Sequence, residues 1–401
     1  MRFAHLADCH IGAWRVAALR ELADEAFAQA ISTCIEQHVD FVLIAGDLFH
    51  TALPGVEHVR HVVKHLTRLK QHRIPVYFIA GSHDFSPTGK TMLSVLEEAG
   101  LARNVCVGEH TEQGFMLQPV QDEKTGVHIT GILGKAGQLD SELYNNLRIQ
   151  EVSGKKLFLF HTTLDELKPA RMAHVTSASA TSLLPQGFDY YAGGHVHIVG
   201  STSLPGYAQI VYPGPLFPAS FSELEELGTG GFYIVELNDG VKKTRIDLPV
   251  CTVRKIHISC DARTPQEVED LIREQLTDLT GSIVLVRLTG MLSQGAAADI
   301  GFAPLFAYAQ KQGAIACLRN TVGVRSPEFV EQEFTPQAAE KIEAEVIHLH
   351  VGQQPIGLSK EEEIALFTQL LNTLGQPQAD GENKAAYELR VVDDAKNVLG
   401  R

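Results

Sequence analysis

The sequence lacks three features that would restrict its function at once: a long apolar run, paired cysteines and an excess of positive charge. No apolar run of about 18 residues occurs, and the opening segment MRFAHLADCH carries His5 and Asp8 within its apolar residues. We therefore expect neither a secretion signal nor a membrane association. The six cysteines are scattered without a CxxC pair, which is typical of reduced thiols and predicts a cytoplasmic protein.

The charge balance argues against a passive nucleic-acid coat. The net charge is -14, whereas proteins that coat nucleic acid are usually basic, because release of counterions from phosphates supplies most non-specific affinity. If this chain acts on nucleic acid, local features must overcome a repulsive overall field. Hydrophobic residues at 44% and charged residues at 20% are ordinary for a globular protein and exclude neither an enzyme nor a binding module.

Short apolar runs alternate with helical segments up to about residue 250, a pattern that predicts an α/β fold with helices flanking sheets. The predicted strands are 2–7, 41–46, 76–81, 156–161, 190–195, 209–214 and 231–237. Each of the first four is followed closely by a side chain able to bind metal, namely Asp8, Asp47, His83 and His161. Ligand sites in open α/β sheets lie beyond the carboxyl ends of strands, so we expect these four residues in one crevice.

With 401 residues, the chain is long enough for two or three domains. Beyond residue 250 the pattern predicts a small β-α-β-α-β unit, whose first helix begins at the capping box of Thr264 and Glu267. The predicted parts are a main domain over 1–250, a small α/β domain over 251–325, a helical region over 326–375 and a mobile tail over 376–401. The tail could add a final helical turn.

A set of histidines and aspartates follows the predicted strands. In order, the chain offers Asp8-x-His10, Gly46-Asp47, Gly81-Ser82-His83-Asp84, His161 and Gly194-His195-Val196-His197. Taken singly, a histidine is more often structural than a ligand, so the interpretation rests on the joint pattern. Carboxylates and imidazoles suit Mn²⁺, Fe²⁺ or Zn²⁺ better than Ca²⁺. Two such ions about 4 Å apart can activate a water and stabilise an in-line displacement at phosphorus.

The order of these motifs resembles the signature of calcineurin-like metallophosphoesterases over residues 8 to 197. The segments "HLADCHIG", "GDLFH" and "YPGP" are further similar to SbcD-type DNA double-strand-break repair nucleases, the prokaryotic counterparts of the meiotic-recombination-eleven nuclease. The resemblance implies a two-sheet metallophosphoesterase sandwich flanked by helices as the nuclease domain. It also implies a small α/β capping domain and a helical C-terminal extension.

The resemblance implies two metal sites that share Asp47. The first metal would be held by Asp8, His10, Asp47 and His197, and the second by Asp47, His161, His195 and the residue at position 82. The ions would be two Mn²⁺, with Fe²⁺ or Mg²⁺ as alternatives. The paired cations would also attract phosphate into an acidic protein.

Three further residues receive catalytic interpretations. His83 matches a histidine that contacts the scissile phosphate and assists the leaving oxygen by hydrogen bonding or protonation. His50 matches a histidine that presents the duplex phosphate for exonucleolytic cutting, although it also begins a polar loop. Asp84 is expected either to orient His83 or to be an exposed residue that caps the following turn.

Function follows from the same resemblance. It implies a two-metal DNA nuclease with 3'-5' exonuclease and endonuclease activity in DNA-end processing, acting as a homodimer with an SbcC-type coiled-coil ATPase. The ATPase would dock on an apolar helical face at Ile364, Phe367, Leu370, Leu371 and Leu374, unless that face packs on its own chain. The alternatives are a small-molecule or cyclic-nucleotide phosphodiesterase, and a non-catalytic scaffold that binds DNA ends or the ATPase.

Position 82 departs from the family pattern, which has asparagine there. A serine hydroxyl is shorter and a weaker donor, so Ser82 binds with a backbone shift, a water fills the gap, or the second site is weak. We predict that the second metal binds more loosely than the first. Titration with Mn²⁺ by calorimetry should show two unequal affinities, and two equally tight ions would contradict the prediction.

Overall fold

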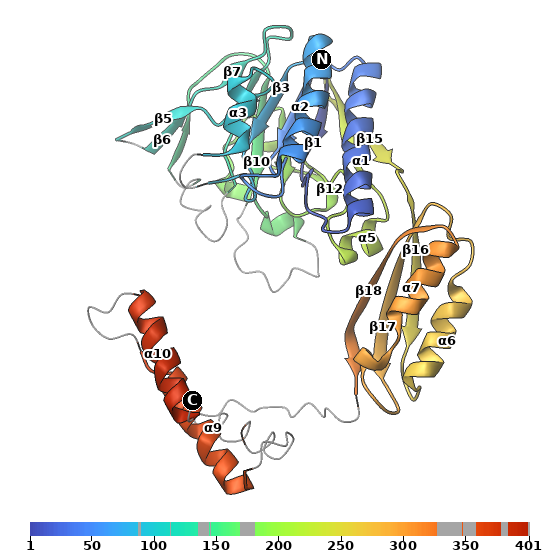
Figure 1. Cartoon of the computed structure of the whole chain (residues 1–401). Coiled ribbons are helices and arrows are strands. Elements are labelled where there is room, and N and C mark those ends of the chain that lie inside the picture. The colour runs from blue at the N-terminus through green and yellow to red at the C-terminus, as the bar shows by residue number, and fades with distance from the viewer. Residues whose placement is uncertain are drawn as a thin grey trace. The chain divides into compact units, whose positions relative to one another are not determined.

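The computed structural model describes most of the chain as two compact units (Figure 1), over residues 1–328 and 329–401. The described residues are 1–86, 90–112, 114–134, 144, 146–168, 181–326, 347, 358–377 and 384–399.

Two six-stranded sheets form the main body of the first unit. The first has the order β15-β14-β1-β2-β3-β4, with β1 (Arg2–Leu6), β2 (Phe41–Ala45), β3 (Val76–Ile79), β4 (Arg103–Asn104), β14 (Gly230–Leu237) and β15 (Val241–Leu248). The second has the order β12-β13-β11-β10-β8-β7, with β7 (Val120–Gln121), β8 (His128–Gly131), β10 (Lys156–His161), β11 (Tyr190–Gly194), β12 (Val199–Leu204) and β13 (Tyr207–Pro213). All seven strands predicted in this region are confirmed, and so is the two-sheet sandwich.

Both faces of the central strands are buried, which explains why these strands read as continuous apolar runs. In β1, Phe3 faces a core shared by the two sheets, while Ala4 and Leu6 face a second core beneath the helices. That second core packs α1 (Ala17–Glu36), α2 (Val56–Gln71) and α3 (Met92–Glu98) onto the first sheet. Figure 1 shows these helices side by side on the outer face of the sheet.

Residues 252–325 contain a separate three-stranded parallel sheet. It consists of β16 (Thr252–Ser259), β17 (Ser282–Met291) and β18 (Ala314–Arg325), covered by α6 (Pro265–Gln275) and α7 (Phe302–Lys311). The predicted capping box of Thr264 and Glu267 is present at the start of α6. Ile283 and Leu285 of β17 also belong to the core under α1, so this sheet packs directly on the main body.

Smaller elements complete the first unit. They are β5 (Gly108–Thr111), β6 (Gly114–Leu117) and β9 (Leu147–Ile149), which form a sheet, the helix α5 (Phe221–Leu227), and 3₁₀ turns at Asp165–Leu167, Thr181–Leu183 and Ala297–Asp299. The sequence had not predicted these short strands.

The second unit contains α9 (Lys360–Leu374) and α10 (Lys384–Val398), which contact each other. The apolar positions predicted on α9 include Leu371 and Leu374, which remain exposed within the unit. The sequence predicted a mobile tail over 376–401 with at most a final helical turn. Helix α10 lies in this segment, so more of the tail is helical than expected. In the described part of the chain, every helix is too short or too polar to cross a bilayer.

Candidate metal centre

The loops after β1 and β2 continue to pair beyond the ends of their strands. Asp8 N donates to the Gly46 carbonyl at 3.2 Å, and His10 N donates to the Asp47 carbonyl at 2.9 Å. The carboxylates then reach the other loops, since Asp8 accepts from His195 N at 2.9 Å and Asp47 accepts from His83 N at 2.8 Å. One network of backbone donors therefore joins four loops from both sheets at the carboxyl ends of their strands.

Left-handed backbone conformations concentrate in these loops. Nine non-glycine residues in the described part of the chain have positive φ. Five of them are predicted metal ligands: Asp8 (51°), His10 (44°), Asp47 (53°), His195 (98°) and His197 (50°). Each such residue costs about 1–3 kcal/mol and persists only where the surrounding structure holds it. Backbone strain that concentrates on the candidate ligands indicates a functional site.

Two motif glycines are required because side chains approach their backbone closely. A Cβ at Gly46, whose φ is 87°, would lie 2.1 Å from Nδ1 of His161. A Cβ at Gly81 would lie 2.2 Å from Oδ1 of Asp47. The glycines let the histidine and the carboxylate approach the neighbouring loops.

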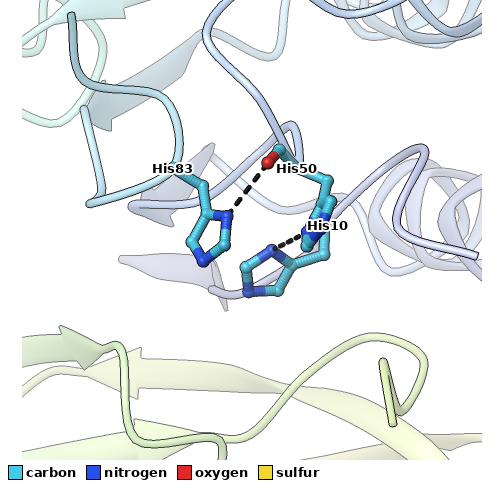
Figure 2. A group of neighbouring side chains, drawn as sticks. All are labelled: His10, His50 and His83. Carbon is cyan, nitrogen blue, oxygen red and sulfur yellow. Dashed lines mark hydrogen bonds between the residues drawn. The ribbon is translucent and has the colours of Figure 1, made fainter. Parts of the chain in front are cut away.

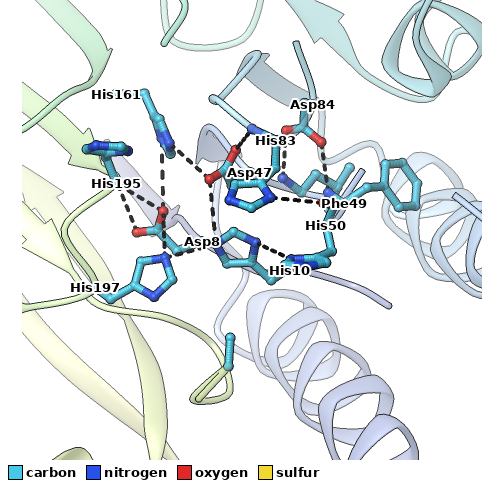
Figure 3. Close-up of polar contacts among 12 residues, drawn as sticks. Asp8, His10, Asp47, Phe49, His50, His83, Asp84, His161, His195 and His197 are labelled. Atoms are coloured by element: carbon cyan, nitrogen blue, oxygen red, sulfur yellow. Dashed lines mark hydrogen bonds and ion pairs between the residues drawn. The ribbon is translucent and has the colours of Figure 1, made fainter. Parts of the chain in front are cut away.

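The predicted ligands of the first metal converge (Figure 3). Asp8, His10 and His197 offer one ligand atom each within 4.8 Å of one another. His10 Nε2 lies 2.8 Å from His197 Nε2 and 3.5 Å from Asp47 Oδ2. All four residues expected around this metal therefore face one point.

Of the ligands predicted for the second metal, only Asp47 and His161 lie in one ligand group. Asp8, Asp47 and His161 offer ligand atoms within 4.8 Å of one another, so Asp8 belongs to both groups, and Asp47 reaches the first group through its 3.5 Å approach to His10. The ring of His195 packs against that of His161, with 5.1 Å between centroids, but His195 belongs to none of the ligand groups among the described residues. Its role as a ligand stays a prediction.

The hydrogen bonds of buried His161 and partly buried His197 leave one ring nitrogen of each available for a metal. His161 Nδ1 lies 2.8 Å from the Ala45 carbonyl, and His197 Nδ1 lies 3.0 Å from Oε2 of Glu223. Because these oxygens only accept, each Nδ1 carries a proton, and loss of the proton from Nε2 leaves a lone pair on that nitrogen for a metal. His161 Nε2 is 3.1 Å from Asp47 Oδ2 but has no hydrogen-bond partner. This is expected for a nitrogen and an oxygen that both bind the same cation. The residues therefore fit a divalent metal.

The pKa values follow from burial and from the mutual proximity of these groups. Burial raises the pKa of Asp8, and Asp47 adds to this shift, while His197 and His161 oppose it. Burial alone would raise the pKa of Asp47, but His161 and His10 outweigh it and hold that pKa well below its usual range. For His161, burial lowers the pKa, but Asp47 and Asp8 raise it to about 9. A proton on His161 thus balances the carboxylates in the metal-free protein.

Three histidines form the rim of the centre (Figure 2). The rings of His50 and His83 stack with 4.7 Å between centroids, and His83 lies 4.8 Å from the ring of His10. His83 Nδ1 donates to the carbonyl of His50 at 2.9 Å, so its Nε2 is the free ring nitrogen. His83 is exposed, whereas His10 is buried. The structure thus brings both predicted catalytic histidines beside a predicted ligand, with His83 on the solvent side.

Asp84 corrects an expectation. Its side chain is 1% exposed, so it is not the exposed aspartate that the sequence suggested. Its carboxylate accepts from Leu48 N at 2.8 Å and from Phe49 N at 2.9 Å, while His83 is held instead by the His50 carbonyl. Burial raises the pKa of Asp84 to about 7, and the nearby Asp47 adds to the shift. Asp84 secures the loop that carries Asp47 and His50.

Position 82 lies between two residues that touch Asp47. A side chain on Gly81 would collide with the Asp47 carboxylate, and His83 N donates to it. The backbone on both sides of Ser82 therefore lies against Asp47, and direct binding of a metal by Ser82 stays a prediction.

Sequence reasoning missed Glu223. Its contact with His197 bridges 26 positions of sequence and no metal-binding motif includes it. The spacing of Ser220 and Glu223 is that of a capping box, which could have located the start of α5 but not the contact with the ligand.

Comparison with known families defines the class of protein. Residues 1–199 match the family model of calcineurin-like phosphoesterases. This range contains every sequence-predicted site residue, and Asp8, His10, Asp47, His161 and His197 lie close together in it. Residues 1–199 therefore form a calcineurin-like phosphoesterase domain.

The similar proteins are more specific. A protein named DNA double-strand break repair protein Mre11 from Archaeoglobus fulgidus is 30% identical over 256 residues, which cover 61% of this chain and 56% of that protein. A protein of the same name from Methanococcus maripaludis is 29% identical, with 65% of this chain and 68% of that protein covered. An uncharacterized metallophosphoesterase, YhaO of Bacillus subtilis, is 27% identical, with 60% and 58% covered. The match spans little more than half of the first relative.

Solved structures show a weaker likeness. A dimetal phosphatase from Danio rerio covers 62% of this chain and 98% of its own, at 12% identity and a TM-score of 0.35. A similarity at this level supports no conclusion about function.

Binding of Mn²⁺ should release a proton, and the affinity should rise with pH up to about pH 9. Metal ligands must be deprotonated, and His161 holds a proton in this range when no metal is bound. Calorimetry in buffers of different ionisation enthalpy measures the released proton. His161→Gln should abolish this release, and His72→Gln, at an exposed histidine following α2, should preserve it. An affinity independent of pH would contradict the assignment.

Replacing Asp84 by alanine should destabilise the protein and weaken metal binding. Two buried backbone N–H groups would lose their acceptor, at a cost of about 1–3 kcal/mol for each unsatisfied group. Urea unfolding and Mn²⁺ titration measure the two effects. Asp239→Ala, at an exposed turn after β14, is the matched control and should change neither. Unchanged stability in the Asp84 variant would refute the role in holding the loop.

Proposed function

We propose that the protein is a metal-dependent DNA nuclease that hydrolyses phosphodiester bonds at a centre for two divalent metal ions, with Mn²⁺ as the preferred metal. Bound ions would supply Lewis-acid chemistry at the phosphate. Support comes from the convergence of Asp8, His10, Asp47, His161 and His197, and from relatives named for repair of DNA double-strand breaks.

The observation that carries the proposal is the exposed ring of His83 beside the metal ligands. Its Nδ1 is fixed by the His50 carbonyl, so Nε2 is free to contact a phosphate oxygen or to protonate the departing oxygen. The stacked ring of His50 limits the rotation of His83. In this proposal the exposed His83 ring lies between solvent and the buried carboxylates, and its Nε2, when protonated, would be the proton donor to a long substrate.

The charge of the protein also indicates that DNA would bind through metal ions in the centre. A chain of net charge -14 repels DNA in general, and the buried aspartates of the centre would repel phosphate most strongly. Metal ions in the centre reverse the local sign. The protein should therefore depend on bound metal for DNA affinity as well as for cleavage.

The finer features are proposed with the same activity. We expect 3'-5' exonuclease and endonuclease cutting in DNA-end processing, a homodimer, a cytoplasmic location and a coiled-coil ATPase partner. The exposed Leu371 and Leu374 on α9 supply an apolar surface for that partner. His195 and Ser82 are proposed as the remaining ligands of the second metal, and His50 as a contact to the duplex phosphate.

Cleavage of linear duplex DNA with Mn²⁺ tests the proposal. His83→Ala should lower the cleavage rate by about 10²–10⁴-fold while Mn²⁺ still binds, because only the proton donor is removed. Asp47→Asn should abolish both cleavage and tight binding of metal, because Asp47 lies between the two ligand groups. His72→Ala, at an exposed histidine, is the control and should cut normally.

The same assay separates the competing functions. A small-molecule phosphodiesterase would hydrolyse a cyclic nucleotide or bis-nitrophenyl phosphate and leave DNA intact. A scaffold would cleave neither substrate yet retain DNA. Either result would overturn the nuclease assignment.

A further inference from the structure

Helix α5 connects the metal centre with the three-stranded sheet of β16, β17 and β18. Two of its glutamates point to different partners: Glu223 contacts His197, and Glu225 contacts Arg287 of β17. Leu224, between them, is fully buried in the core under α1. The helix is therefore fixed to the main body while each neighbouring glutamate engages a different structure.

The Glu223 carboxylate is positioned before it meets His197. Oε2 accepts from Ala219 N at 2.9 Å, and Oε1 accepts from Ser220 Oγ at 3.0 Å. The same Oε2 lies 3.0 Å from His197 Nδ1. Only 15% of the Glu223 side chain is exposed, so water competes little for these contacts. Such a carboxylate can hold an imidazole in one orientation.

The other glutamate anchors the helix. Glu225 forms a two-pronged ion pair with Arg287, through Nε at 2.6 Å and Nη2 at 2.5 Å. The Arg287 guanidinium also lies over the ring of Phe221, the first residue of α5, at 5.1 Å. His257 of β16 adds a third contact to Glu225 at 3.0 Å. The sheet of β16, β17 and β18 thus holds α5 in place within one turn of Glu223.

We propose that Glu223 is a positioning residue, which keeps the proton of His197 on Nδ1 and aims Nε2 at the first metal, and that the Arg287–Glu225 pair holds the helix that presents it. A carboxylate bonded to the far nitrogen of a histidine ligand fixes its tautomer and raises its basicity. The inference rests on the proposed metal centre. It goes further by making metal affinity depend on a helix outside the matched family region.

Glu223→Gln tests the positioning role. Glutamine keeps the capping box and an acceptor oxygen for Ala219 N and His197 Nδ1, but it removes the negative charge that raises the basicity of His197. Mn²⁺ affinity measured by calorimetry should fall about 10–100-fold, with the melting temperature of the metal-free protein nearly unchanged. Glu226→Gln, on the exposed side of the same helix, removes an equal charge and should preserve the affinity.

The possible outcomes distinguish this inference from the proposed function. If the unmodified protein binds no Mn²⁺, the metal centre and the inference both fail. If it binds Mn²⁺ and Glu223→Gln binds equally well, only the inference is overturned. A lower metal-free melting temperature with unchanged affinity would likewise reduce Glu223 to a helix cap.

A second measurement needs no variant at this position. The nitrogen chemical shifts of the His197 ring are measured in the unmodified metal-free protein, at a pH where the ring is neutral. They should report the Nδ1–H tautomer, and the Nε2–H tautomer would overturn the proposal.

Arg287→Lys tests the anchoring pair. It keeps the positive charge but loses the two-pronged geometry, so Mn²⁺ affinity should fall by a smaller factor than in Glu223→Gln. An unchanged affinity in Arg287→Lys would remove the anchoring role.

Discussion

The carboxylate of Asp47 is the group on which the rest of the centre depends. It accepts from His83 N, faces Nε2 of His161 at 3.1 Å and lies 3.5 Å from Nε2 of His10. It is also pressed so closely against Gly81 that no side chain fits there. The two carboxylate oxygens of Asp47 thus contact His83 at the rim, the buried His161 and the loop that contains Gly81.

The local backbone shows what this arrangement costs. Asp47 itself has a left-handed conformation, as do four other predicted ligands. The strained loops are held by backbone bonds between them and by Asp84, which is buried beneath the Asp47 loop. The sheets contribute by burying both faces of β1 and β2, so the strands cannot shift to relieve the strain. The rigid sandwich is therefore part of the chemistry of the site.

Much of this was predictable from sequence for identifiable reasons. Parallel strands place the residues that follow them at one edge, so Asp8, Asp47 and His161 could be assigned to one crevice without knowing the sheet order. Burial and side-chain partners were less accessible. Asp84 looks like a turn residue in the sequence, and its two backbone donors, Leu48 and Phe49, lie 36 and 35 positions away. Glu223 presents the same difficulty, because only the folded chain brings α5 beside His197.

We infer that Asp47 is shared by two metal ions. Anomalous scattering from crystals grown with Mn²⁺ measures this most directly, because it locates each ion independently of activity. The account predicts two peaks, both in contact with the Asp47 carboxylate, one beside His10 and His197 and the other beside His161. A single peak, or two peaks of which either lies away from Asp47, would contradict it.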